Sequence, residues 1–273
     1  MKLSTSLTIT IIVMTLLFVA QDPAPPQSSV ETLAKQELDE AARAYRAGNF
    51  AEAQARSERA MQLDPQNKTA PFFVARTIHA QYRPGIVTPE NLAKAREAII
   101  AYQRVLDRSP GDDEAYKAIA YLYGALKEED LLRDWILQRA GNVSFRNDKR
   151  AEAYVVLASK DWDCSFKMTE QPGTKVTTIE GNKSYVTYRM PKERFEFERA
   201  KECANRGLEY VNMAITLAPE NESAWSYKTN ILLELAKLAE MSGDAQTKTD
   251  FYRQYDDALK ETTKLSKRSQ PNP

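Results

Sequence analysis

Hydrophobic positions recur with a helical period in several separate segments of the chain. The segments 47–67, 94–112 and 202–225 each place apolar residues on one helix face, and each contains a proline that a new helix start soon follows. Proline ends a helix because it lacks the amide hydrogen and disfavours helical geometry in the residue before it. A recurring amphipathic helix pair cannot bury its apolar face alone, so neighbouring pairs must stack. The pattern therefore predicts an all-α solenoid of helix hairpins.

The same small, aromatic and proline residues return at matching places in successive pairs. They are Ala41, Gly48, Phe50, Ala53, Ala60 and Pro65 in the first pair, Ala75, Ala98, Tyr102 and Pro110 in the second, and Tyr154, Leu157, Ala158, Gly207, Val211, Ala214 and Pro219 in the fourth. This pattern resembles the tetratricopeptide repeat (TPR) family, whose unit is about 34 residues of helix, turn and helix. The resemblance implies a TPR-like α-solenoid of about five helix pairs over 29–268, and a scaffold for partner proteins.

Some of the implied units are longer than the family repeat, which indicates insertions. They run over 34–67, 68–112, 113–143, 151–220 and 222–267. The prolines at 65, 110 and 219 are too far apart for plain units, and the extra residues fall at 83–93 and 165–202, between paired helices in both cases. We therefore expect both insertions on one edge of the solenoid. Insertions repeated on one edge often mark a binding surface.

The larger insertion breaks the helical period. Segments 175–179 and 184–190 are rich in β-branched and aromatic residues and are separated by Glu-Gly-Asn-Lys, which predicts a small β-hairpin. Residues 165–169 are expected to add a third short strand. The only two cysteines, Cys164 and Cys203, flank this insertion, and the repeat register implied by the resemblance makes them neighbours. In an exported chain this favours a disulfide worth about 4 kcal/mol; the alternative is two buried apolar side chains.

The beginning of the chain has the features of a targeting segment. Lys2 precedes the uncharged apolar run 7–20, and a proline-rich linker follows at 21–28. This predicts a signal peptide or an N-terminal anchor at 1–20, and hence export to the periplasm or cell envelope. If the segment stays uncleaved, residues 3–20 hold the protein in the membrane. The last residues, 269–273, are expected to form a disordered tail.

Composition argues against catalysis and against nucleic acid as a partner. The chain has 38 basic and 38 acidic residues, so it lacks the net positive charge that phosphate backbones require. A single histidine leaves no second imidazole for a metal site or proton relay, and none of the nine glycines belongs to a phosphate-binding loop. We therefore expect no enzyme activity, no metal and no cofactor.

The TPR resemblance implies where a partner binds. In that family the first helix of each pair lines an inner face that often receives an extended peptide. The register puts these residues on or near it: Arg76, His79, Lys117, Tyr121, Ser159, Trp162 and Asn230. Tyr185 and Tyr188 on the hairpin complete the predicted partner-binding set. The family clamp for a terminal carboxylate is not reproduced, since Leu38 and Ala42 occupy its first-unit places.

These observations leave three hypotheses open. The first is an exported, non-catalytic scaffold that binds a protein or peptide through the inner groove and the insertion-bearing edge. The second is a membrane-anchored structural or assembly element of an envelope complex. The third, an enzyme hidden in the insertion, has no constellation of reactive residues behind it. An unused, merely solvated groove also remains open for the inner-face residues.

Overall fold

The computed structural model of the chain describes residues 27–269. The predicted targeting segment at 1–20, the linker as far as residue 26 and nearly all of the predicted tail lie outside the described residues. The described residues divide into two compact units, with the boundary between Thr77 and Ile78. No helix among the described residues is long and apolar enough to cross a membrane.

The first unit is a helix hairpin followed by the start of a third helix. It contains α1 (Gln27–Arg46), α2 (Phe50–Leu63) and the first part of α3 (Ala70–Gln81). Gly48, with φ of 79°, makes the tight turn between α1 and α2. Ala41, Ala53 and Ala60 are completely buried. Their small side chains let the paired helices approach closely, as the sequence pattern predicted.

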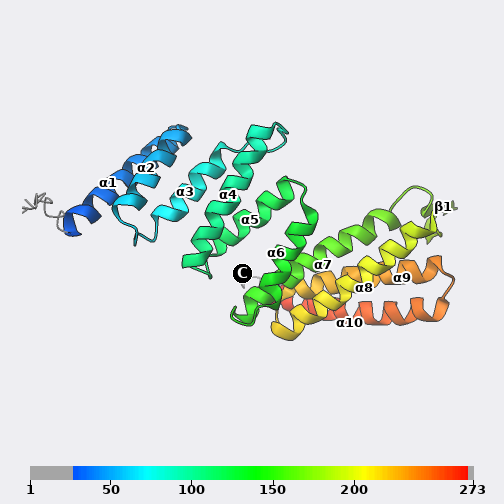
Figure 1. Ribbon diagram of the computed structural model, residues 1–273. Coiled ribbons are helices and arrows are strands. Elements are labelled where there is room, and N and C mark those ends of the chain that lie inside the picture. Colours follow the sequence, from blue (N-terminus) through cyan, green and yellow to red (C-terminus); the bar gives the residue numbers. More distant parts are fainter. Residues whose placement is uncertain (1–26, 270–273) are drawn as a thin grey trace, which may run out of the picture. The chain divides into compact units, whose positions relative to one another are not determined.

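The second unit continues with the rest of α3 and seven further helices. They are α4 (Pro89–Arg108), α5 (Asp113–Ala125), α6 (Glu129–Gly141), α7 (Asn147–Thr169), α8 (Arg194–Leu217), α9 (Glu222–Met241) and α10 (Ala245–Ser269). From α4 onward each helix packs against the next, and α7 also packs against α9 (Figure 1). The predicted fold class, a TPR-like α-solenoid of helix pairs, is confirmed.

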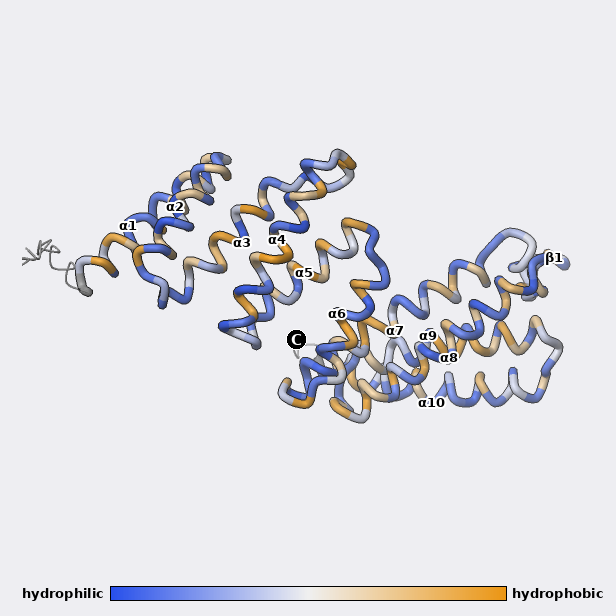
Figure 2. Tube along the Cα trace, viewed as in Figure 1, coloured by the Kyte–Doolittle hydropathy of each residue, from blue (hydrophilic) through white to orange (hydrophobic). Residues whose placement is uncertain are grey.

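Four helices of this unit begin at capping side chains; in α10, Asp244 accepts a hydrogen bond from the backbone of Thr247. Thr88 accepts a hydrogen bond from the backbone of Asn91, Asp112 from that of Ala115, and Asn221 from that of Ala224. Each cap satisfies an amide of the first turn that has no partner within the helix. Along the helices hydrophobic positions alternate with hydrophilic ones (Figure 2), and the hydrophobic ones pack between neighbouring helices.

The tightest packing lies where α7, α8 and α9 meet. Val211, Ile231 and Leu235 belong to one buried cluster there. A Cβ atom on Gly207 would lie 3.1 Å from Ile231 Cδ1 and 3.3 Å from Asp161 Cβ. Glycine at this position therefore sets how closely α8 can approach both of its neighbours.

The insertion between α7 and α8 forms the predicted hairpin. Strands β1 (Lys175–Glu180) and β2 (Lys183–Tyr188) pair antiparallel across a two-residue turn, in which Gly181 has φ of 60°. The prediction of a third strand at 165–169 is wrong, because α7 continues to Thr169. Ser165 and Thr169 are one helical turn apart, and both hydroxyls donate to Glu234 of α9. These bonds favour helix over the local β propensity.

The hairpin packs on the end of α9, next to the α9–α10 turn. The backbone N–H of Tyr188 donates to Glu240 Oε1 at 2.9 Å, and Glu240 also pairs with Lys248 of α10 at 2.8 Å. Within the second unit the α3–α4 loop, the hairpin and the α9–α10 turn all lie at the same ends of their helix pairs (Figure 1). The hairpin therefore contacts α9 within one turn of its connection to α10.

Candidate functional site

A continuous row of aromatic side chains follows the line where α7 packs against α9. The Trp162 ring centroid lies 5.0 Å from that of Phe166 and 6.0 Å from that of Tyr227 on α9. Farther along, Lys237 Nζ lies 5.3 Å from the centroid of Phe166 and 5.1 Å from that of Tyr188 on the hairpin. We call these five side chains the α7–α9 stripe.

Helical spacing explains why these residues share one surface. Phe166 follows Trp162 by four positions on α7, so the two rings stack along one face. On α9, Tyr227, Asn230 and Lys237 recur at three and seven positions, which also places them on one face. Asn230 is half-buried on that face, one turn from Tyr227. The stripe is therefore built by two regular helices and closed at one end by β2.

The stripe is packed on its inner side and open on its outer side. Trp162, Tyr188 and Tyr227 pack against the buried cluster of α7, α8 and α9 and keep part of each ring accessible. Phe166 is 36% exposed. Rigidly held aromatic rings with an accessible face are typical of protein-binding surfaces, because they contribute much contact area at little entropic cost.

A network of buried, paired charged side chains holds Lys237 of the stripe in place. Glu234 is 1% exposed and Lys237 is 5% exposed. Lys237 Nζ donates to Glu234 Oε1 at 2.7 Å and to Glu170 Oε1 at 2.8 Å, while Thr169 Oγ1 donates to Glu234 Oε2 at 2.6 Å. Burying charges is costly unless they are paired and hydrogen-bonded, and both conditions are met here.

The network also fixes the hairpin to the helices. Lys175 of β1 pairs with Glu170 at 2.5 Å, and the Tyr188 hydroxyl donates to the same carboxylate at 3.4 Å. Burial alone raises the pKa of Glu170, but the hydrogen bonds from Lys175 and Lys237 outweigh it and hold that pKa below its ordinary value. Burial alone would lower the pKa of Lys237. The hydrogen bonds to Glu170 and Glu234 outweigh burial and hold that pKa above its ordinary value.

These shifts predict that attachment of the hairpin is sensitive to acid. Because the folded-state pKa of Glu170 is depressed, its contribution to stability is present above the unfolded value near 4.5 and is lost as pH falls through the folded value. We expect Glu170→Gln to lower the free energy of unfolding by about 2 kcal/mol near neutral pH. The difference from the parent protein should shrink in acid below that pKa.

Urea unfolding at several pH values measures this difference directly. The matched control is Glu220→Gln, because Glu220 is exposed and pairs only at the surface with Arg268. That variant should track the parent protein at every pH. A gap between Glu170→Gln and the parent that stays constant into acid would contradict the assignment.

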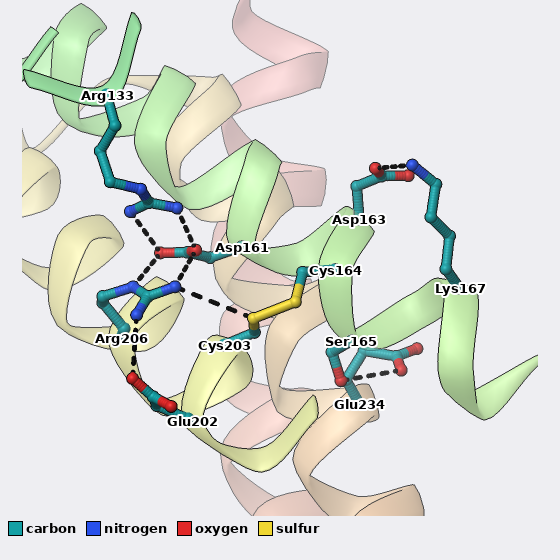
Figure 3. Close-up of a disulfide and its surroundings, with 10 residues drawn as sticks. All are labelled: Arg133, Asp161, Asp163, Cys164, Ser165, Lys167, Glu202, Cys203, Arg206 and Glu234. Carbon is teal, nitrogen blue, oxygen red and sulfur yellow. Dashed lines mark hydrogen bonds and ion pairs between the residues drawn. A yellow bond between two sulfur atoms is a disulfide. The ribbon is translucent and has the colours of Figure 1, made fainter. Parts of the chain in front are cut away.

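A second polar centre joins α6, α7 and α8 beside the disulfide (Figure 3). The Asp161 carboxylate is completely buried. Oδ1 accepts from Arg133 Nη2 at 2.7 Å and from Arg206 Nη2 at 2.8 Å, and Oδ2 accepts from Arg206 Nε at 2.9 Å. The hydrogen bonds to Asp161 raise the pKa of both arginines despite their partial burial. Both guanidiniums therefore stay charged.

The predicted disulfide is present. Cys164 on α7 and Cys203 on α8 are bonded, with their Cα atoms 6.1 Å apart. It closes a loop that contains the whole hairpin, so the two helices that carry the insertion are joined covalently as well as by Asp161. The alternative of two separate buried thiols is excluded, because no free cysteine occurs among the described residues.

The remaining predicted partner-binding residues do not belong to the stripe. His79 Nδ1 lies 3.3 Å from the Tyr102 hydroxyl, and its ring centroid lies 5.7 Å from that of Tyr121. Burial lowers the pKa of His79. Lys117 is exposed on α5, one turn before Tyr121. In the first unit, the Arg76 guanidinium lies 4.9 Å from the Tyr45 ring centroid.

The structure therefore groups only some of the predicted residues. It brings Trp162 and Tyr188 into one row and pairs His79 with Tyr121, while Tyr185 is 45% exposed on β2. Sequence reasoning missed four members of the site and its support: Glu170, Phe166, Tyr227 and Lys237. Two of them carried a usable signal, since Phe166 follows Trp162 by one helical turn and Tyr227 precedes Asn230 by one. The prediction of a strand at 165–169 concealed the helical spacing of Trp162 and Phe166.

The one charged side chain of the stripe, Lys237, is held by carboxylates of the supporting network. Within the described residues, no group of three or more histidine, cysteine, aspartate or glutamate side chains is placed to hold a metal ion. Lys237 is hydrogen-bonded to two carboxylates. The accessible part of the site is formed by the aromatic rings, with the half-buried Asn230 amide on the same face of α9.

Several solved structures share features with this chain. No protein-family model and no curated protein sequence matches it. MamA from Desulfovibrio magneticus is 13% identical over 87% of this chain and 97% of its own, with a TM-score of 0.43. PilF from Pseudomonas aeruginosa is 11% identical over 88% and 100%, with a TM-score of 0.38. A tetratricopeptide repeat protein from Parabacteroides merdae is 12% identical over 86% and 98%, with a TM-score of 0.36. At these values no function is transferred to the chain.

Proposed function

We propose that this protein is a non-catalytic scaffold that binds an extended segment of another protein along the α7–α9 stripe. The observation that carries the proposal is the row of partly exposed rings formed by Tyr227, Trp162 and Phe166. The buried ammonium of Lys237 connects this row to the Tyr188 ring, and its paired carboxylates hold it in place. Rings fixed in this way present apolar area that a partner can cover without first having to be ordered.

The chemistry of the stripe indicates what kind of segment it takes. Aromatic faces accept aliphatic or proline side chains, and the Asn230 amide can both donate to and accept from a peptide group. Lys237 already has two carboxylate partners, so an acidic side chain of the ligand gains little from it. The segment we propose is therefore extended and apolar at its centre.

We also propose that the protein acts outside the cytoplasm. The apolar run at 7–20 supports this, and so does the disulfide between Cys164 and Cys203, because disulfides persist in oxidising compartments. Intact-mass measurement of the protein from fractionated cells tests the proposal. A processed chain outside the cytoplasm would agree with a free scaffold. An unprocessed chain in the membrane fraction would agree with the membrane-anchored alternative. A chain found in the cytoplasm would contradict both.

Removing the two central rings should abolish binding. Peptides selected from a random displayed library on the parent protein are expected to bind Trp162→Ala/Phe166→Ala about 30-fold more weakly or worse, since truncating aromatic anchors typically costs 2 kcal/mol or more. Fluorescence polarisation with labelled synthetic peptides measures the affinities, and circular dichroism confirms that the variant is folded.

The matched control removes an aromatic ring of the same exposure elsewhere. Tyr252 on α10 is 37% exposed, against 36% for Phe166. We expect Tyr252→Ala to bind the selected peptides within about twofold of the parent. Peptides that lose no affinity with the stripe variant, or that lose as much with the control, would refute the assignment of the stripe.

A further inference from the structure

A cleft lies between α7 and the beginning of α8, and Cys164 of the disulfide lines it. The cleft has a volume of about 420 Å³, and Cys164 forms part of its wall together with Lys167, Phe195 and Arg199. Neither the aromatic stripe nor the hairpin strands line it. A cleft of this size holds a small molecule and leaves no room for a folded protein domain.

The two sulfur atoms of the disulfide are in different surroundings. Cys203 is 4% exposed, while Cys164 is only half-buried and lines the cleft. A reagent that enters the cleft therefore meets Cys164 first. The attacked sulfur in thiol–disulfide exchange is the one the incoming thiolate can reach.

The buried sulfur is placed to leave as a thiolate. Arg206 Nη2 lies 3.8 Å from Cys203 Sγ (Figure 3). Arg206 also pairs with the buried carboxylate of Asp161 and with Glu202 at 3.2 Å, and these bonds hold its guanidinium in place beside the sulfur. A neighbouring guanidinium stabilises a thiolate, and a stabilised thiolate is a better leaving group.

From this asymmetry we propose that the Cys164–Cys203 disulfide is a thiol–disulfide exchange site for a small-molecule thiol. The thiolate of the incoming molecule attacks Cys164 Sγ, a new sulfur–sulfur bond forms, and the bond to Cys203 breaks. Cys203 leaves with the electron pair as a thiolate beside Arg206. A second thiol molecule completes the reduction, releasing the small-molecule disulfide. This inference is independent of the proposed peptide binding.

The walls of the cleft indicate the class of thiol. They carry both signs of charge in equal number, from Lys160, Lys167, Arg199, Glu129, Asp163 and Glu196. A wall of this kind suits a molecule with both carboxylates and an ammonium group. The thiols of that description and size are cysteine and short cysteine-containing peptides.

Reduced glutathione is the probe for the first test. The native, oxidised protein is incubated with it, quenched by alkylation and mapped by mass spectrometry. We expect at least about tenfold more glutathione on Cys164 than on Cys203, with Cys203 recovered in alkylated form. Equal labelling of the two cysteines, a preference for Cys203, or no adduct before global unfolding would overturn the proposal.

A second test asks whether the thiol arrives through the cleft. Lys167→Glu/Arg199→Glu changes the charge of the cleft wall at two exposed residues. It should slow opening by glutathione by about fivefold, because the attacking species is anionic. The control Lys192→Glu/Lys201→Glu makes the same charge change at exposed residues outside the cleft lining and should leave the rate nearly unchanged. Equal rates for the two variants would overturn entry through the cleft.

Discussion

Replacing Asp161 by asparagine is expected to lower the free energy of unfolding by about 3 kcal/mol, the lower end of the range for breaking a buried ion pair. The substitution keeps the shape of the side chain and removes the negative charge that Arg133 and Arg206 share. The lower end applies because each arginine side chain is about a third exposed, at 30% and 33%, and can recover part of its hydration. Chemical denaturation at constant m-value measures the loss.

Asp163→Asn on the same helix is the matched control. Asp163 is 46% exposed and pairs with Lys167, which is 72% exposed, so its removal should cost less than about 0.5 kcal/mol. The contrast tests whether Asp161 holds α6, α7 and α8 together. A loss below 0.5 kcal/mol for Asp161→Asn would show that the buried pair contributes nothing net.

The second large effect is expected from removing the disulfide. Cys164→Ala/Cys203→Ala should lower the free energy of unfolding by about 4 kcal/mol, because the bond closes a loop over a separation of 39 residues. The comparison is made by denaturation of parent and variant, each with and without a reducing agent. The reducing agent should destabilise the parent and leave the variant unchanged.

The comparison of the parent with Cys164→Ala/Cys203→Ala can also contradict this prediction. If parent and variant unfold at the same denaturant concentration under oxidising conditions, the bond does not restrict the unfolded chain as assumed. The outcome also stands apart from the exchange proposal, which concerns the sulfur that is attacked and not the stability that the bond provides.

Local repetition explains what the sequence revealed about the fold. Helix pairs, their proline ends and their small contact residues depend on neighbours a few positions away, so periodicity predicts them. Gly48 and Gly181 likewise mark turns whose backbone angles favour glycine. The pairing of Cys164 with Cys203 followed from the implied repeat register, because deleting the insertion puts the two cysteines at adjoining helix ends.

Long-range pairing explains what the sequence concealed. Glu234, Lys237 and Asp161 are charged residues within amphipathic helices, and such residues usually lie in solvent. Lys237 and Asp161 are buried here because partners more than 25 positions away, Glu170 and Arg133, help to neutralise them, and Glu234 is buried because it pairs with Lys237. Periodicity carries no information about such partners. For the same reason the sequence did not predict the charge network that holds the stripe in place. It predicted only some of the aromatic residues of the stripe.

The most direct test of the scaffold proposal is photocrosslinking from within the stripe in the cells that produce the protein. Phe166→p-benzoylphenylalanine places a reactive group at the centre of the stripe, and Tyr252→p-benzoylphenylalanine places it at equal exposure on α10. We predict a defined crosslinked partner from position 166 that disappears when Trp162→Ala is added, and no such product from position 252. The same product from both positions, or none from position 166, would contradict binding along the stripe.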